Sequence, residues 1–61
     1  MIATATTPIR VMLIDDHAVV RAGLRALIEN RPGLKVVGEA ANRTDSLAVA
    51  AREHPDIILK T

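Results

Sequence analysis

The chain has 61 residues, of which 49% are apolar, and it contains no Cys, Phe, Tyr or Trp. A chain this short forms one small domain with an aliphatic core, and such a core rarely supplies more than about 3–5 kcal/mol without disulfides, metal or association. Eight basic residues stand against seven acidic ones. Because the basic residues are scattered and no aromatic side chain can stack on a base, the composition argues against nucleic-acid binding.

Residues 1–8, MIATATTP, precede the first apolar run. They have no basic n-region and no long apolar stretch, so they do not resemble a secretory signal. No apolar run approaches the roughly 20 residues that a membrane span needs. We therefore expect a flexible leader over 1–8, a domain over 9–61, and a cytoplasmic location.

The first half of the domain changes from a strand pattern to a helix pattern. IRVMLI, residues 9–14, is nearly continuously apolar, which predicts a strand buried on both faces. A helical spacing follows, and it ends at Pro32 and Gly33. Its expected buried stripe is Val20, Leu24, Leu27 and Ile28. Gly23 inside this helix suggests close packing against the sheet.

The second half predicts another strand, a helix and the start of a third strand. LKVVGEA, residues 34–40, alternates and is more polar, as in an edge strand. Asn42 with Asp45 predicts the start of a helix that runs to about Glu53. The stripe expected on its buried face is Leu47, Ala50 and Ala51. DIILKT, residues 56–61, begins the third strand.

This βαβαβ order predicts an α/β fold with parallel strands and right-handed crossovers. Strand order 1-2-3 would place both helices on one face of the sheet. Strand order 2-1-3 would place one helix on each face, as in a partial doubly wound fold. The continuously apolar first strand favours the order 2-1-3, because the strand is then central and covered on both sides. Ligands in such sheets bind where the strand order reverses, which is beside Asp15, Asp16 and Thr61.

The adjacent pair Asp15 and Asp16 has two interpretations. The pair can begin the first helix by capping and by favourable charge at the helix N-terminus, which is worth about 0.3–1 kcal/mol. It can also form half of a cation site, because two neighbouring carboxylates repel each other without a cation. We expect the neighbouring His17 to be an exposed or capping residue of the first helical turn, rather than to bind a metal.

Three other charged or titratable side chains have simpler interpretations. We expect Arg21 and Arg25 to lie on a solvated helix face, with Arg25 able to pair with Glu29 four residues on. We expect His54 to make a favourable contact with the C-terminal end of the second helix.

The sequence resembles the first half of a bacterial response-regulator receiver domain. The phrases VMLIDDHAVVRAGLRALIE, PGLKVVGEAAN and AREHPDIIL resemble those of the NarL/FixJ (LuxR-type) subfamily, over residues 10–59. The resemblance implies a flavodoxin-like sheet in order 2-1-3-4-5 and phosphoryl transfer from a sensor histidine kinase to an Asp that ends the third strand. It also implies that Asp15 and Asp16 correspond to the acidic pair that helps to bind Mg²⁺, a cation that prefers carboxylate oxygens.

The sequence departs from the family at Lys60 and Thr61. The resemblance places the phosphoacceptor Asp at position 61, where this chain has Thr61, its last residue. A Thr hydroxyl is a weak nucleophile without an activating base, and the sequence shows no base near it. Lys60 replaces a commonly apolar residue, and a buried ammonium is costly. A frameshift, a premature stop or a cloning boundary would fit this ending better than a natural half-domain.

We therefore expect a truncated receiver domain that is not an enzyme, is inactive in phosphotransfer and binds Mg²⁺ weakly or not at all. Its third strand would be an open edge, which predicts a homodimer or higher oligomer. The alternative is an interaction module that docks on a kinase or a full-length regulator without chemistry. A third alternative, an active phosphoacceptor or phosphatase, would require reaction at Thr61.

Overall fold

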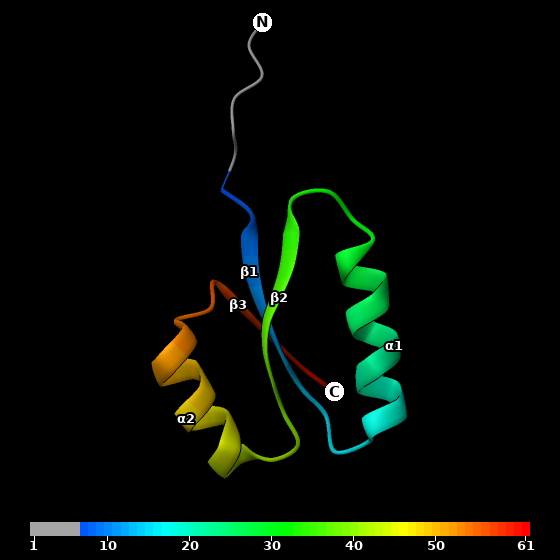
Figure 1. The fold of residues 1–61 in the computed structure, drawn as a ribbon. Helices are drawn as coiled ribbons and strands as arrows, with labels where there is room; N and C mark the ends of the chain where they lie inside the picture. Colours follow the sequence, from blue (N-terminus) through cyan, green and yellow to red (C-terminus); the bar gives the residue numbers. More distant parts are fainter. Residues whose placement is uncertain (1–6) are drawn as a thin grey trace, which may run out of the picture.

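The computed structural model describes residues 7–61 and has the predicted order of elements (Figure 1). The elements are β1 (Ile9–Ile14), α1 (Ala18–Glu29), β2 (Leu34–Ala40), α2 (Arg43–Glu53) and β3 (Ile57–Lys60). The leader predicted over residues 1–8 lies outside the described residues, except for Thr7 and Pro8. Among the described helices, none is long and apolar enough to cross a membrane.

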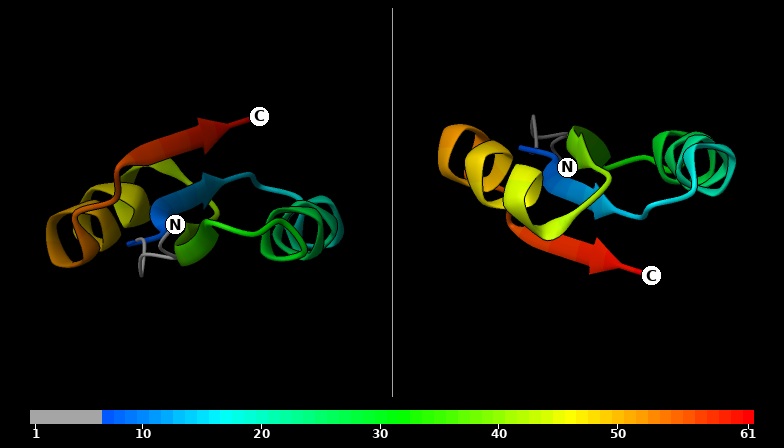
Figure 2. Two further views of the ribbon diagram at one scale, coloured as in Figure 1. Left: turned by 90° about the horizontal axis from the view of Figure 1, so that it is seen from above. Right: turned by 90° about the horizontal axis from the view of Figure 1, so that it is seen from below.

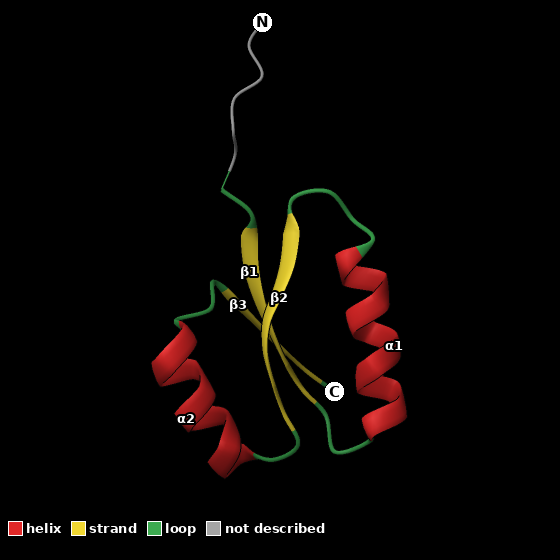
Figure 3. Ribbon diagram, in the orientation of Figure 1, coloured by secondary structure: helices red, strands yellow, loops and turns green. Residues whose placement is uncertain are grey.

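The three strands form one parallel sheet in the order β2-β1-β3, which confirms the predicted layout. The two crossovers place α1 on one face of the sheet and α2 on the other (Figures 2 and 3). Both helices lie over β2 and β1. In the end-on views of Figure 2, β3 extends beyond the helices.

The core lies around the central strand. Val11 and Leu13 on the α1 face of β1 pack with Val36 of β2, and Leu24 and Ile28 of α1 cover them. On the opposite face Met12 is fully buried. The pattern of the first strand therefore predicted its central position, because only a central strand needs apolar side chains on both faces.

The predicted stripe of α1 is half right. Leu24 and Ile28 contact the core, whereas Val20 and Leu27 are 47% and 67% exposed. The interpretation of Gly23 is wrong, because it is exposed and a Cβ built on it would meet no atom within 4 Å.

The predicted stripe of α2 is also largely wrong. Leu47 is 62% exposed, and the face that meets the sheet instead carries Ser46 and Val49. Val49 lies over Gly38 of β2, where a Cβ would come within 2.5 Å of the valine Cγ1. This glycine follows a shift of register between β1 and β2, and its lack of a side chain lets the helix approach the strand closely.

The ends of α2 match the sequence signals. The Asn42 side chain accepts a hydrogen bond from the Asp45 N–H at 2.8 Å, as an N-cap residue does. His54 ends the helix in the left-handed conformation with φ of 49°. His54 therefore lies at the C-terminal end of α2, where the favourable contact with the helix dipole was expected. Glycine adopts this left-handed conformation at lower cost.

Strand β3 is the exposed edge of the described sheet. Its members Ile57, Ile58 and Leu59 are 43%, 48% and 41% exposed. Lys60 is exposed as well, so the burial cost expected for its ammonium group does not arise here. The predicted open edge is present, and it is apolar.

Candidate functional site

The carboxyl ends of β1 and β3 meet at one end of the sheet, beside the N-terminus of α2. A hollow at this end is lined by Ile14, Asp15, Asp16, Ala41, Asn42, Arg43, Lys60 and Thr61. Parallel strands end at the same edge of a sheet, so residues 46 positions apart in the chain come together here. The structure thus brings together the three residues that the sequence analysis singled out.

Asp15 is the buried member of the acidic pair. Its side chain is 5% exposed, and its Oδ1 atom accepts a hydrogen bond from the His17 backbone N–H at 2.7 Å. Its Oδ2 atom accepts a hydrogen bond from the Thr61 hydroxyl. The carboxylate therefore connects the loop after β1 with the residue after β3.

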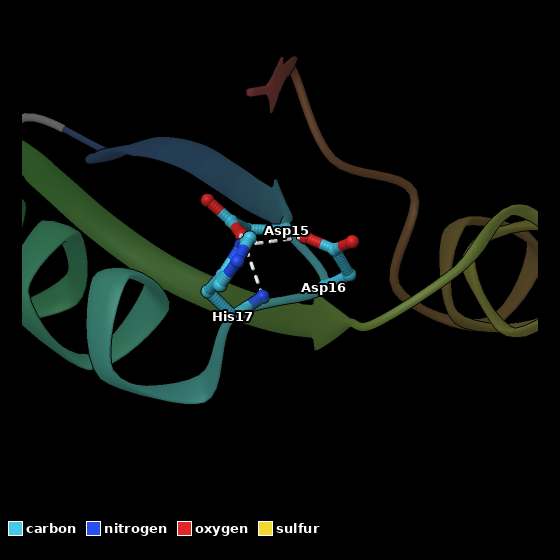
Figure 4. A group of neighbouring side chains, drawn as sticks. All are labelled: Asp15, Asp16 and His17. Carbon is cyan, nitrogen blue, oxygen red and sulfur yellow. Dashed lines mark hydrogen bonds and ion pairs between the residues drawn. The ribbon is translucent and has the colours of Figure 1, made fainter.

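Asp16 and His17 form the exposed side of the cluster (Figure 4). The His17 Nδ1 atom lies 2.7 Å from Asp16 Oδ1 and 3.4 Å from Asp15 Oδ1. Both side chains are more than 70% exposed. Asp15, Asp16 and His17 each offer one possible ligand atom for a metal, and these three atoms lie within 4.8 Å of one another. Within the described residues, they form the group of this kind.

The capping interpretation of the acidic pair is wrong. The N-cap residue of α1 is His17, which makes no side-chain capping hydrogen bond, and the first turn of α1 contains no acidic residue. Asp15 binds the N-cap residue itself, in a tight turn that ends β1 and directs the chain into the helix. Asp15 therefore shapes the loop before α1.

Thr61 has a carboxylate beside it, contrary to the expectation from sequence. The Thr61 backbone N–H donates to the Ile14 carbonyl at 3.1 Å, which continues the β1–β3 pairing. This bond holds the Thr61 hydroxyl next to Asp15. The sequence could not reveal this contact, because it depends on the register between two strands far apart in the chain.

The hydrogen bonds at Asp15 change its acidity. The bond from the Thr61 hydroxyl, followed by that from the His17 N–H, holds the pKa of Asp15 below its usual value, because both donors stabilise the ionised carboxylate. Desolvation by burial acts in the opposite direction. Asp15 is therefore ionised at neutral pH and is a weaker base than an ordinary carboxylate.

Sequence reasoning missed an arginine–glutamate network that supports the loop. Arg21 donates to the Asp15 carbonyl at 2.6 Å and to Glu39 of β2 at 3.0 Å. Arg25 donates to Glu39 at 2.5 Å and to Glu29 at 3.4 Å, and these carboxylates raise its pKa. The predicted Arg25–Glu29 pair is present. Arg21, however, is only 21% exposed in its side chain, so it does not lie on a solvated face.

The residues present do not fit Mg²⁺ well. A protein Mg²⁺ site needs oxygen ligands that can turn toward the cation in an octahedron. Three of the four carboxylate oxygens of the pair already have partners: Thr61, the His17 N–H and the His17 ring. The residue that follows β3 supplies a hydroxyl donor where a third carboxylate would strengthen cation binding.

Comparison with known proteins connects the chain to one class of regulators. It is 47% identical over 51 residues to the transcriptional regulatory protein LiaR of Bacillus subtilis, a match that covers 84% of this chain and 24% of LiaR. It is 42% identical over 52 residues to the nitrate/nitrite response regulator protein NarL of Escherichia coli K12, covering 85% of this chain and 24% of NarL. No profile of a known protein family matches the chain.

A solved structure agrees with these relatives. A two-component response regulator of the LuxR family from Aurantimonas sp. SI85-9A1 superposes with a TM-score of 0.79 at 46% identity, covering 85% of this chain and 37% of that protein. The chain thus spans about a quarter of the length of the curated relatives that it matches.

Proposed function

Since this chain is a homologue of LuxR-family response regulators and has the fold of the first part of their receiver domain, we propose that it is a receiver segment of a two-component system that does not itself accept a phosphoryl group. In this proposal it acts in the cytoplasm, it is not an enzyme, and its ancestral partner is a sensor histidine kinase. Asp15 and Asp16 are the remnant of an Mg²⁺ site.

One observation carries the proposal. The Thr61 hydroxyl, which is hydrogen-bonded to Asp15, occupies the position where the family resemblance implies a phosphoacceptor Asp. A hydroxyl attacks phosphorus well only when a base removes its proton. The base at hand is Asp15, whose pKa is lowered by this same hydrogen bond. The contact therefore makes Asp15 a poorer base, and it leaves Thr61 a weak nucleophile.

The direct test is to incubate the chain with acetyl phosphate and MgCl₂ and to measure its intact mass. A full-length LuxR-family regulator serves as the positive control. We expect a phosphate adduct on the control and none on this chain. An adduct that forms on this chain and disappears in Thr61→Val would overturn the proposal and make Thr61 the acceptor.

We also propose that the chain associates with a second copy through β3. Neither helix packs on this strand, and its outer edge has no neighbour in the described sheet. Ile57 and Leu59 lie opposite Val11 and Leu13 of β1, so both side chains project on the α1 face. A long apolar edge of this kind favours pairing with another chain.

The alternation along β3 limits the registers of the pair, and we propose the register that is centred on Ile58. In an antiparallel pair with its two-fold axis perpendicular to the sheet, Ile58 faces its own counterpart. Ile57 of each copy then faces Leu59 of the other copy on the shared α1 face. Shifting this register by one residue would place side chains from opposite faces across from each other.

A charge at the centre of this pairing tests the association through β3. Ile58→Lys places two like charges directly opposite each other, so we expect it to abolish the association. Val19→Lys is the matched control, because Val19 is 86% exposed on α1 and lies away from β3. Equal effects of the two substitutions on the solution mass would exclude pairing through β3.

A second candidate function is an interaction module that docks on a kinase or a full-length regulator without chemistry. The observation in its favour is that α1 buries none of its residues fully and presents Val19 to solvent. In this function the chain would compete with a LuxR-family regulator for its kinase. If excess chain leaves phosphotransfer between that pair unchanged, the docking function is excluded.

A further inference from the structure

We infer that the Thr61 hydroxyl takes over the structural role of a divalent cation at this end of the sheet, so that the loop after β1 is held in place without metal. The inference rests on the proposed function in one respect, namely that Thr61 stands where the family resemblance implies a carboxylate.

The charge of the buried Asp15 carboxylate is compensated by hydrogen-bond donors of the chain. Asp15 is buried with its neighbour Asp16 beside it, and a buried carboxylate is costly unless donors or a cation compensate it. Here the compensation comes from the chain: Oδ1 accepts from the His17 N–H, and Oδ2 accepts from the Thr61 hydroxyl. No buried polar side-chain atom in the described residues is left without a partner.

The ends of β1 and β3 are connected by groups of the chain. A cation bound by the acidic pair and by a carboxylate after β3 would connect the ends of β1 and β3. The Asp15–Thr61 hydrogen bond makes this connection directly, and the Thr61 backbone bond to Ile14 fixes the hydroxyl in position. Arg21 holds the other side of the loop through the Asp15 carbonyl. The loop is therefore fixed from both sides by groups of the chain itself.

The Thr61 hydroxyl and a cation would compete for the same carboxylate oxygen of Asp15. A cation that bound Asp15 through Oδ2 would have to displace the Thr61 hydroxyl, and one that bound Asp16 through Oδ1 would have to displace the His17 ring. A carboxylate at position 61 would instead repel Asp15 in the absence of metal and bind the cation in its presence. Position 61 thus determines whether metal stabilises this end of the sheet.

Equilibrium unfolding of the 61-residue chain tests the inference, with urea midpoints measured in EDTA and in 1 mM MgCl₂. We expect the wild-type midpoint to be the same in both buffers. We expect Thr61→Asp to lower the midpoint in EDTA and to recover it in MgCl₂. Thr61→Val should lower the midpoint in EDTA, whereas Thr44→Val, a matched substitution at an exposed threonine of α2, should change it much less.

A second measurement does not depend on any variant being folded. Mn²⁺, used as a paramagnetic probe for Mg²⁺, should broaden the amide signals of Asp15 and Asp16 in the wild-type chain no more than that of the exposed Asp45. Selective broadening at the pair, or a wild-type midpoint that rises with MgCl₂ as much as that of Thr61→Asp, would overturn the inference. A phosphate adduct at Thr61 would overturn the proposed function and leave these readouts unaffected.

Discussion

Asp15 is the residue on which the local architecture depends most. Its carboxylate accepts hydrogen bonds from the N-cap residue of α1 and from the residue that follows β3, and its carbonyl accepts one from Arg21. Asp15 therefore connects the loop after β1 with α1 and with the end of β3. The donors to its carboxylate favour the ionised form, so folding lowers its pKa.

This shift makes the stability of the fold depend on pH in the acidic range. Because the pKa of Asp15 is lower in the folded chain than its ordinary value of 3.8, the unfolded chain binds more protons between the two pKa values. The stabilisation is thus complete above the unfolded pKa and is lost as the pH falls through the folded one. We expect urea midpoints to fall steadily from about pH 5 downward.

Asp15→Asn is the variant that checks this pH dependence. It should flatten the curve of midpoint against pH in the acidic range, since it removes the shifted group. Asp16→Asn is the matched control, because Asp16 lacks the hydrogen bond to Thr61 and lies on the exposed side of the cluster. A curve for Asp15→Asn as steep as that of the wild type would contradict this account of the pair.

His54 gives a second prediction at the scale of a single residue. It holds a left-handed conformation at the C-terminal end of α2, which costs a residue with a Cβ roughly 1 kcal/mol relative to glycine. We expect His54→Gly to stabilise the chain by about 0.5–1 kcal/mol in urea unfolding. A loss of stability would instead mean that the imidazole makes a larger favourable contact with the helix end than the conformation costs.

At the scale of the elements, close approach between α2 and β2 depends on Gly38. A Cβ at this position would lie 2.5 Å from Val49 Cγ1, and a valine methyl group has little freedom to move away. We expect Gly38→Ala to destabilise the chain by about 1–3 kcal/mol, as overpacking does.

Gly23→Ala is the matched control for Gly38→Ala, because Gly23 lies in α1 with open space around its Cα. This substitution should stabilise the chain by about 0.5–1 kcal/mol through helix propensity. If both alanine substitutions changed the stability of the chain in the same direction, the packing of α2 against β2 would differ from that described here.

The elements also show how far the sequence predicts this fold. The bounds of β1 and β2, the N-cap at Asn42 and the order β2-β1-β3 were all predicted, because each depends on local pattern or on the rule for crossovers. The buried faces of the helices were predicted only in part, because Leu24 and Ile28 pack on the core as expected whereas Leu27 and Leu47 do not. Leu47 and Leu27 are exposed because both helices lie over β2 and β1 and leave β3 uncovered.

The sequence predicted where the candidate site lies, but it did not predict the hydrogen bonds within the site. Strand order placed Asp15, Asp16 and Thr61 at one end of the sheet. The hydrogen bond between Asp15 and Thr61 and the role of Arg21 depend on side-chain positions across strands and helices, which no spacing in the sequence specifies. The alternative of helix capping by the pair failed because α1 begins later than the pair, with His17 at the N-cap position.

At the scale of the whole molecule, the described sheet buries few apolar side chains. The buried ones are Val11, Met12, Leu13, Val36 and Ala40. A core of this size supplies little stability by itself, while the apolar residues of β3 remain partly exposed. Both features support the proposal that the folded chain associates with a second copy along β3.

This association is tested by the solution mass, measured by size-exclusion chromatography with light scattering at several concentrations of the 61-residue chain. We expect a discrete dimer whose fraction rises with concentration, because β3 gains a hydrogen-bonding partner from a second copy. A well-folded monomer that persists at the highest concentration would contradict it.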